Sequence, residues 1–235
     1  MIRVTVWNEN LHDRTLDIVK QIYPEGIHGA IAAFLGKRDD IIVRTATFEQ
    51  PEHGLTEEVI KDTDVLIIWS HALNEEFSDE VAERVCEAVR GGMGLISLHS
   101  SHKSKIMMGL MGTSMTLKWM HDDRERLFVT APAHPIADGL PECFELECEE
   151  MYGEFFDIPR PDDVVFMGWF ESGYLFRSGC TFTRGYGKIF YFQPGHETCP
   201  TYHDENIQKV ITNAVYYCAP AKRVDGPLEC TPIHR

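Results

Sequence analysis

The sequence contains few basic residues for its number of acidic ones. Lysine and arginine total 22 against 37 aspartates and glutamates, so the formal net charge is −15. Nucleic acids and anionic membranes bind to basic surfaces, and the composition therefore argues against both as partners. The sequence also lacks an apolar run that could span a bilayer, and its first residues lack the apolar core of a signal peptide. We expect a cytoplasmic protein.

Paired cysteines are also missing. The seven cysteines are scattered, and none belongs to a Cys-x-x-Cys pair. The odd number and the spacing predict reduced thiols rather than a disulfide framework. A buried free cysteine usually behaves as a small hydrophobic residue, so a catalytic cysteine is the less favoured interpretation. Cys199 is the first candidate to test, because it follows His196 closely in the sequence.

The remaining composition is typical of a globular protein, with 43% hydrophobic and 25% charged residues among 235. A chain of this length can bury a substantial core without a disulfide or a structural metal. It contains no repeat and no clear linker, so we predict one domain over residues 1–235. The polar tail from about residue 220 is either loose or an arm on a neighbouring subunit, which makes a homo-oligomer compatible with the sequence.

The first hundred residues alternate between strand and helix patterns. This alternation predicts a doubly wound, mainly parallel sheet with right-handed crossovers. Strands are expected at 2–7, 41–48, 64–69 and 94–98, with helices within 14–35, from 56 and over 78–90. The second half is less regular, with strands expected at 144–149, 164–170, 173–182 and 188–192, a loop at 132–141, and helices at 104–110 and 202–218. In the first of these strands, Glu145, Glu147 and Glu149 alternate with apolar residues and are expected to form a solvated face.

Polar side chains follow four of the predicted strands. They are Glu9 with His12, Ser70 with His71, His99-Ser100-Ser101-His102, and His196-Glu197. The carboxyl ends of parallel strands meet at one edge of a sheet, where ligands bind. We therefore expect a shared pocket there.

Two chemistries fit these residues. In the first, His99, His102 and His196 bind a divalent cation such as zinc, and Glu197 or Glu9 orients a ligand or acts as general base. In the second, Ser100 or Ser101 is a nucleophile served by His196 and Glu197. The glycines of a Gly-x-Ser-x-Gly nucleophile elbow are absent, which favours the first.

Other residues complete the predicted site or lie outside it. Glu150 and Tyr152 are candidate substrate contacts, together with His12, His71, Ser100 and Ser101. Trp7 and Trp69 end strands at the proposed site, where they belong to the core or pack against a sugar ring. The histidines without evident partners are expected at the surface: His28, His53, His121, His203 and His234.

Several segments resemble the trehalose-utilisation, ThuA-like family across nearly the whole chain. They are Val6-Trp7-Asn8-Glu9-Asn10 with His12, Gly92 to Ser100, Leu110-Met111-Gly112-Thr113, Ala133-His134-Pro135-Ile136, Glu149 to Phe156, and Phe192-Gln193-Pro194-Gly195-His196-Glu197. The resemblance implies a flavodoxin-like three-layer sandwich similar to class I glutamine amidotransferases. Those enzymes carry a nucleophilic cysteine after a central strand and a His-x-Glu pair. Here the turn holds His99 instead, and no residue separates His196 from Glu197, which argues against glutamine hydrolysis.

The resemblance implies a role in the catabolism of trehalose or related disaccharides, including oxidised (keto) sugars. The leading hypothesis is a histidine-based or metal-assisted hydrolase, lyase or isomerase with His99, His196, Glu197 and Glu9 as catalytic residues. The alternative is a non-catalytic sugar-binding or regulatory module that keeps the amidotransferase-like fold without its nucleophile. Fold alone does not separate these two hypotheses.

Overall fold

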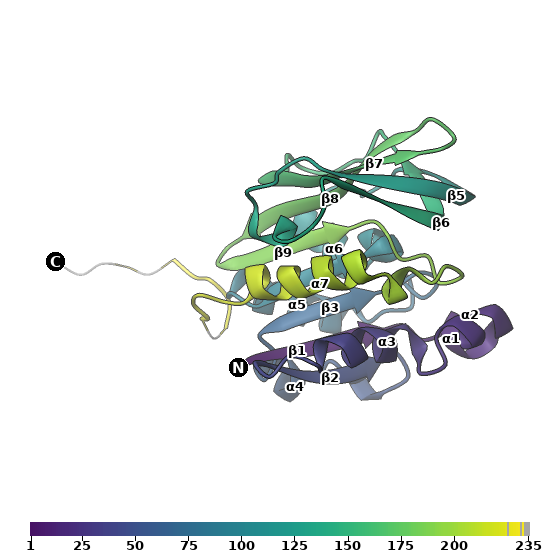
Figure 1. Ribbon diagram of the computed structural model, residues 1–235. Coiled ribbons are helices and arrows are strands. Elements are labelled where there is room, and N and C mark those ends of the chain that lie inside the picture. Colours follow the sequence, from purple (N-terminus) through teal and green to yellow (C-terminus); the bar gives the residue numbers. More distant parts are fainter. Residues whose placement is uncertain (225, 231, 233–235) are drawn as a thin grey trace.

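The computed structural model describes residues 1–224, 226–230 and 232. In this part of the chain, one nine-stranded mixed sheet runs through the molecule (Figure 1). Its strands in spatial order are β2 (Ile41–Thr47), β1 (Ile2–Asn8), β3 (Val65–Trp69), β4 (Gly94–Leu98), β9 (Gly187–Phe192), β8 (Leu175–Arg184), β7 (Asp163–Phe170), β5 (Lys118–Val129) and β6 (Cys143–Gly153).

The first five strands in this order pair in parallel, as the sequence predicts. The remaining four extend the sheet by antiparallel pairing. Every residue of β3 and β4 is buried, because helices cover both faces of these central strands. The chain returns from the antiparallel half through β9, which places the segment after residue 192 beside the end of β4.

Two hydrophobic cores lie on opposite faces of the sheet, so the molecule is a three-layer α/β sandwich. One core is packed under α2 (Asp17–Ile22), α3 (Gly26–Leu35) and α7 (Glu205–Cys218), with α1 (His12–Thr15) leading into α2. The other is packed under α4 (Glu57–Lys61), α5 (Asp79–Arg90) and α6 (Lys105–Met111) (Figure 1).

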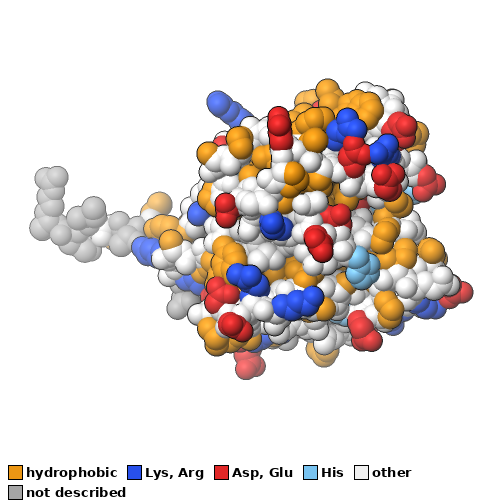
Figure 2. Space-filling view, viewed as in Figure 1, with side chains coloured by type: hydrophobic (Ala, Val, Ile, Leu, Met, Phe, Trp, Pro, Cys, Tyr) orange, Lys and Arg blue, Asp and Glu red, His pale blue; other side chains and the backbone are white. Residues whose placement is uncertain are grey.

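Side-chain caps start the helices on the second face. The hydroxyls of Thr56, Ser78 and Ser104 accept hydrogen bonds from the backbone amides of Val59, Val81 and Met107. Each bond satisfies an amide that has no partner inside the helix. None of the helices in the described part of the chain is long and apolar enough to cross a membrane. On the face shown in Figure 2, basic side chains are interspersed with acidic ones rather than gathered in one area.

Three expectations need correction. Strand β5 was not predicted, because the charged run Asp122–Arg126 lacks an alternating pattern. The solvated-face prediction is wrong for Glu149, which is fully buried. The prediction of reduced thiols is wrong for Cys148 and Cys199, which form a disulfide because the fold brings β6 against the segment after β9.

The start of the polar tail packs on its own chain. The Val224 amide donates to the Gly91 carbonyl at 2.7 Å, and the Arg223 guanidinium donates to the backbone carbonyls of Ile60 and Thr63. These contacts hold Arg223 and Val224 against the turns that precede β3 and β4.

Candidate active site

His99 is the first residue after β4 and lies in a sharp turn. Its φ of +51° is uncommon for a residue other than glycine. The imidazole is fully buried, and its Nδ1 donates to the Gln193 carbonyl at 2.8 Å. A carbonyl can only accept, so Nδ1 carries a proton. Nε2 faces the carboxylate of Glu150 at 3.2 Å.

Two aromatic rings fix the plane of the His99 imidazole. Tyr152 stacks at 5.1 Å between ring centroids and 16°, and Trp69 stacks at 6.5 Å and 12°. The Trp69 indole is itself held by a 2.9 Å hydrogen bond to the Gly195 carbonyl. The direction in which Nε2 points is therefore set by packing against these two rings.

Two groups of potential ligands lie at this edge of the sheet. The first group is His99, Glu150 and His196, all buried, with ligand atoms within 4.8 Å of one another. Oε2 of Glu150 lies 3.2 Å from His99 Nε2 and 4.0 Å from His196 Nδ1. Both nitrogens are buried, and within the described residues neither makes a hydrogen bond of standard geometry.

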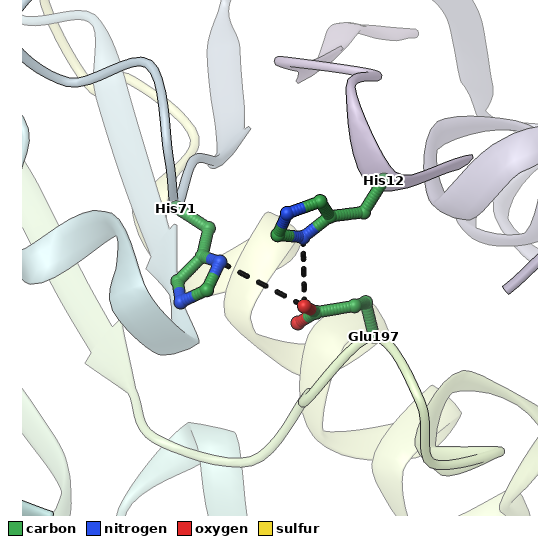
Figure 3. A group of neighbouring side chains, drawn as sticks. All are labelled: His12, His71 and Glu197. Carbon is green, nitrogen blue, oxygen red and sulfur yellow. Dashed lines mark ion pairs between the residues drawn. The ribbon is translucent and has the colours of Figure 1, made fainter. Parts of the chain in front are cut away.

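The second group is His12, His71 and Glu197, which come from the segments after β1, β3 and β9 and point toward one another (Figure 3). Oε1 of Glu197 lies 2.7 Å from His12 Nδ1 and 3.7 Å from His71 Nδ1. The other oxygen of Glu197 lies 3.2 Å from Nδ1 of His196, a member of the first group. The two groups are thus contiguous.

The carboxylates and imidazoles of the two groups shift one another's pKa values. Burial acts to raise the pKa of Glu197, but the contact with His12 and the neighbouring imidazoles outweighs it and lowers the pKa to about 2. The same contact raises the pKa of His12. Burial, assisted by the nearby His99, lowers the pKa of His196 to about 4. For His99, burial acts to lower the pKa, but Glu150 and the other carboxylates raise it overall.

A pocket of about 480 Å³ opens beside the first group. Its walls include Glu150, Tyr152, His71, Ser100, His102 and Trp119. This volume is within the range of sites that bind small molecules. The structure therefore brings together most of the residues predicted as substrate contacts.

His102 lies in the pocket wall, and the residues that the structure describes place it in neither group. Its Nδ1 donates to the Met115 carbonyl at 2.7 Å, and burial lowers its pKa to about 3. The third potential ligand beside His99 and His196 is Glu150, where His102 was predicted. His102 instead offers the pocket a neutral imidazole.

Glu9, Ser100 and Ser101 are bound to the backbone. The Glu9 carboxylate accepts hydrogen bonds from the amides of His71, Ala72 and Leu73. The Ser100 hydroxyl donates to the Ser70 carbonyl, and the Ser101 hydroxyl accepts from the Ser70 amide. These three residues shape the segment after β3, a different role from acid–base or nucleophilic chemistry.

Two functional side chains were missed in the sequence. His121 on β5 places Nδ1 3.2 Å from Oε1 of Glu150 and lines the pocket, and the missed strand concealed it. Glu149 accepts hydrogen bonds from the amides of Gly195 and His196 and from the Thr201 hydroxyl. The adjacent disulfide secures the same segment. The available signal was the end of the alternating pattern, because the consecutive glutamates Glu149 and Glu150 point to opposite faces of a strand and cannot both belong to one solvated face.

The remaining predictions concern two tryptophans and the histidines expected at the surface. Trp7 and Trp69 are fully buried, so neither offers a ring to the pocket, whereas Trp119 does. The other histidines expected at the surface have partners: His28 contacts Asn8, His53 lies between Phe48 and Ser78, and His203 contacts Ile22. His234 lies outside the described residues.

The sequence profile of the ThuA family, described as trehalose utilisation, matches residues 3–218. No curated protein gives a match. Among solved structures, a ThuA-like protein from Parabacteroides merdae is similar over 96% of this chain and 92% of its own, with 14% identity and a TM-score of 0.68.

Two further structures share the fold. A cytoplasmic protein from Salmonella typhimurium LT2 is similar over 93% of this chain and all (100%) of its own, with 13% identity and a TM-score of 0.63. A glutamine amidotransferase from Thermotoga maritima is similar over 93% and 98%, with 9% identity and a TM-score of 0.51. These likenesses confirm the predicted flavodoxin-like, amidotransferase-like fold.

Proposed function

The chain belongs to the ThuA family of trehalose-utilisation proteins, and from that premise we propose that it is an enzyme of carbohydrate catabolism. Its substrate class is a disaccharide or a keto-sugar derivative, bound in the pocket beside His99. We also propose a cytoplasmic location, with the similarly folded cytoplasmic protein of Salmonella typhimurium as support.

The first group is proposed to hold a divalent cation such as zinc. Two imidazoles and a carboxylate are typical ligands of catalytic zinc. Tetrahedral zinc, with ligands at about 2.1 Å, separates ligand atoms by about 3.4 Å, and the distances of 3.2 and 4.0 Å bracket this value. The His99 bond to the Gln193 carbonyl is the outer contact that metal-binding histidines usually make. When bound, such a cation would polarise a sugar oxygen or activate a water molecule.

The residues of the pocket bind and orient the sugar. His102, with its low pKa, presents a neutral ring that can accept a hydrogen bond from a sugar hydroxyl. Trp119 is 60% exposed at the pocket and offers an apolar face of the kind that packs against sugar rings. His121 and Glu150, 3.2 Å apart, form a charge-assisted pair between the wall and the first group.

One observation carries this proposal: two buried imidazole nitrogens, His99 Nε2 and His196 Nδ1, converge on one oxygen of a buried carboxylate, Oε2 of Glu150, at 3.2 and 4.0 Å. Buried polar groups in native proteins are nearly always satisfied, and a cation among these three atoms would satisfy all of them.

The test is metal analysis of the purified full-length chain, combined with turnover of a panel of disaccharides and their keto derivatives. We expect bound zinc, and we expect His99→Ala to lose both the first-group cation and turnover. His203→Ala, at an exposed position, is the matched control. If the wild-type chain binds no cation and His99→Ala turns over sugar at the wild-type rate, the proposed mechanism is wrong.

The second candidate is a non-catalytic sugar-binding module. The observation in its favour is that a histidine occupies the turn after β4, where amidotransferases carry their cysteine. This candidate predicts sugar binding in calorimetry with no turnover. Turnover that His196→Ala abolishes would exclude it.

A further inference from the structure

We propose that the second group, His12, His71 and Glu197, binds a second divalent cation, and that Glu197 bridges the two sites of a binuclear centre. This inference extends the proposed function, because it adds a site to the cation already assigned to the first group. It assigns a ligand role to two histidines that sequence reasoning placed among the substrate contacts.

The donor set of the second group suits a transition-metal cation. It offers two imidazoles and one carboxylate from three separate segments. Oε1 of Glu197 lies 2.7 and 3.7 Å from the Nδ1 atoms of His12 and His71, again bracketing the separation of about 3.4 Å expected around zinc. Both Nδ1 atoms are buried, and neither makes a hydrogen bond of standard geometry to any residue that the structure describes.

Glu197 is placed to serve both groups. Its Oε1 faces His12 and His71, whereas its Oε2 lies 3.2 Å from Nδ1 of His196 in the first group. Oε2 is buried and has no hydrogen-bond partner. One carboxylate oxygen toward each cation is the arrangement by which enzymes hold two metals about 3.5–4 Å apart.

The surrounding structure holds this group rigidly. Glu9 binds the amides of three consecutive residues from His71, which fixes the segment that carries this imidazole. Asp13, next to His12, accepts hydrogen bonds from the Ile27 amide and the Asn8 side chain. Ligands fixed in this way lose little freedom when a cation binds.

Charge also favours a second cation. Side chains of Glu150 and Glu197 are each only 4% exposed, and Glu149 is fully buried nearby. Buried carboxylates are costly unless positive charge accompanies them. In the second group, Glu197 faces the imidazoles of His12, His71 and His196, and a divalent cation among them would add positive charge beside this buried carboxylate.

The experiment removes all metal from the full-length chain with a chelator and titrates it with zinc alone. Calorimetry and elemental analysis after dialysis then give the stoichiometry. We expect two zinc ions per wild-type chain, and one in His12→Ala, His71→Ala or His99→Ala. His203→Ala is the matched control and should still bind two zinc ions per chain. Circular dichroism confirms that each variant is folded.

The position of the second ion is tested with manganese and electron paramagnetic resonance. Two neighbouring manganese ions couple magnetically, so we expect a coupled spectrum from the wild type and that of an isolated ion from His71→Ala. In Glu197→Gln, the affinity of the second group should fall at least about tenfold and the coupling should disappear.

The outcomes separate this inference from the proposed function. A single zinc ion in the wild type, lost in His99→Ala and kept in His12→Ala and His71→Ala, overturns the second site and leaves the first intact. Two ions in His12→Ala and His71→Ala also overturn it. No bound zinc in the wild type overturns both sites.

Discussion

The Glu9 carboxylate accepts a 2.7 Å hydrogen bond from the backbone amide of His71. The same carboxylate also binds the next two amides, so one buried side chain positions the segment that follows β3. Glu9, which follows β1, therefore fixes the position of the backbone that carries the His71 imidazole after the neighbouring strand β3.

Glu9→Gln should destabilise the fold. The amide group of glutamine would direct N–H donors at backbone N–H groups, so at least one hydrogen bond to a charged acceptor is lost. We expect the free energy of unfolding to fall by about 1.5–3 kcal/mol, measured with urea. Glu76→Gln, at an exposed position in the same connecting segment, should change it by less than about 0.5 kcal/mol. Equal stability of the two variants would contradict this role of Glu9.

Reduction of the Cys148–Cys199 disulfide should lower stability. The bond closes a loop with a sequence separation of 51 residues, and such a crosslink restricts the unfolded chain. We expect dithiothreitol to lower the free energy of unfolding by about 2–4 kcal/mol. Cys148→Ser should match the reduced wild type, whereas Cys143→Ser, at an exposed free thiol, should match the oxidised one. Identical urea midpoints with the bond open and closed, as checked by mass spectrometry, would refute the prediction.

Glu125 should make stability depend on pH. Its carboxyl is fully buried, accepts one hydrogen bond from Ser178, and has its pKa raised by burial and by the charges of Glu149 and Asp123. At a pH between the ordinary and the raised pKa, the Glu125 carboxyl is therefore protonated in the folded state and ionised in the unfolded state. Stability is fully present below the ordinary pKa of about 4.5 and declines as pH rises toward the raised value.

Glu125→Gln removes this titration. The variant should gain stability relative to the wild type as pH rises from 5 to 8, measured by urea unfolding at each pH. Glu58→Gln, at an exposed helical position, is the control and should show no such trend. A constant difference between Glu125→Gln and the wild type would show that Glu125 does not titrate as described.

Trp119→Ala should weaken substrate binding without affecting the fold. Because the ring is 60% exposed, its loss should change stability by less than about 0.5 kcal/mol. The loss of aromatic packing, about 0.5–1.5 kcal/mol, should raise KM about two- to tenfold and leave kcat within about twofold. Trp169→Ala is the matched control, because this exposed tryptophan lies outside the pocket walls. An unchanged KM in Trp119→Ala would rule out stacking.

The parallel half of the sheet could be predicted because its strands and caps follow simple rules. Buried runs such as that of β4 read as central strands, and Thr56 and Ser78 occur immediately before acidic first turns. Strand β5 does not follow these rules. Asp122 has a φ of +56°, and irregular pairing on both sides of Asp123 disrupts the alternation. These features arise from tertiary pairing and leave no periodic pattern in the sequence.

The site was predictable in part for a similar reason. His99, His196 and Glu197 follow parallel strands, so the topology alone brings them together. His102 follows the same strand as His99 but does not share its group, and its Nδ1 is bound to the Met115 carbonyl. Glu149 and Glu150 are both buried although they are neighbours on one strand, since each binds a different partner across the sheet.

The late return of β9 to the parallel half has a consequence for folding. Residues of the two groups are spread from position 12 to position 197, and the last two follow all nine strands in the sequence. Contacts so distant in sequence form slowly, because a long loop must close before they contribute. A chain emerging from the ribosome therefore has no assembled site until most of it has been synthesised, and a cation at the proposed sites would stabilise only the completed sheet.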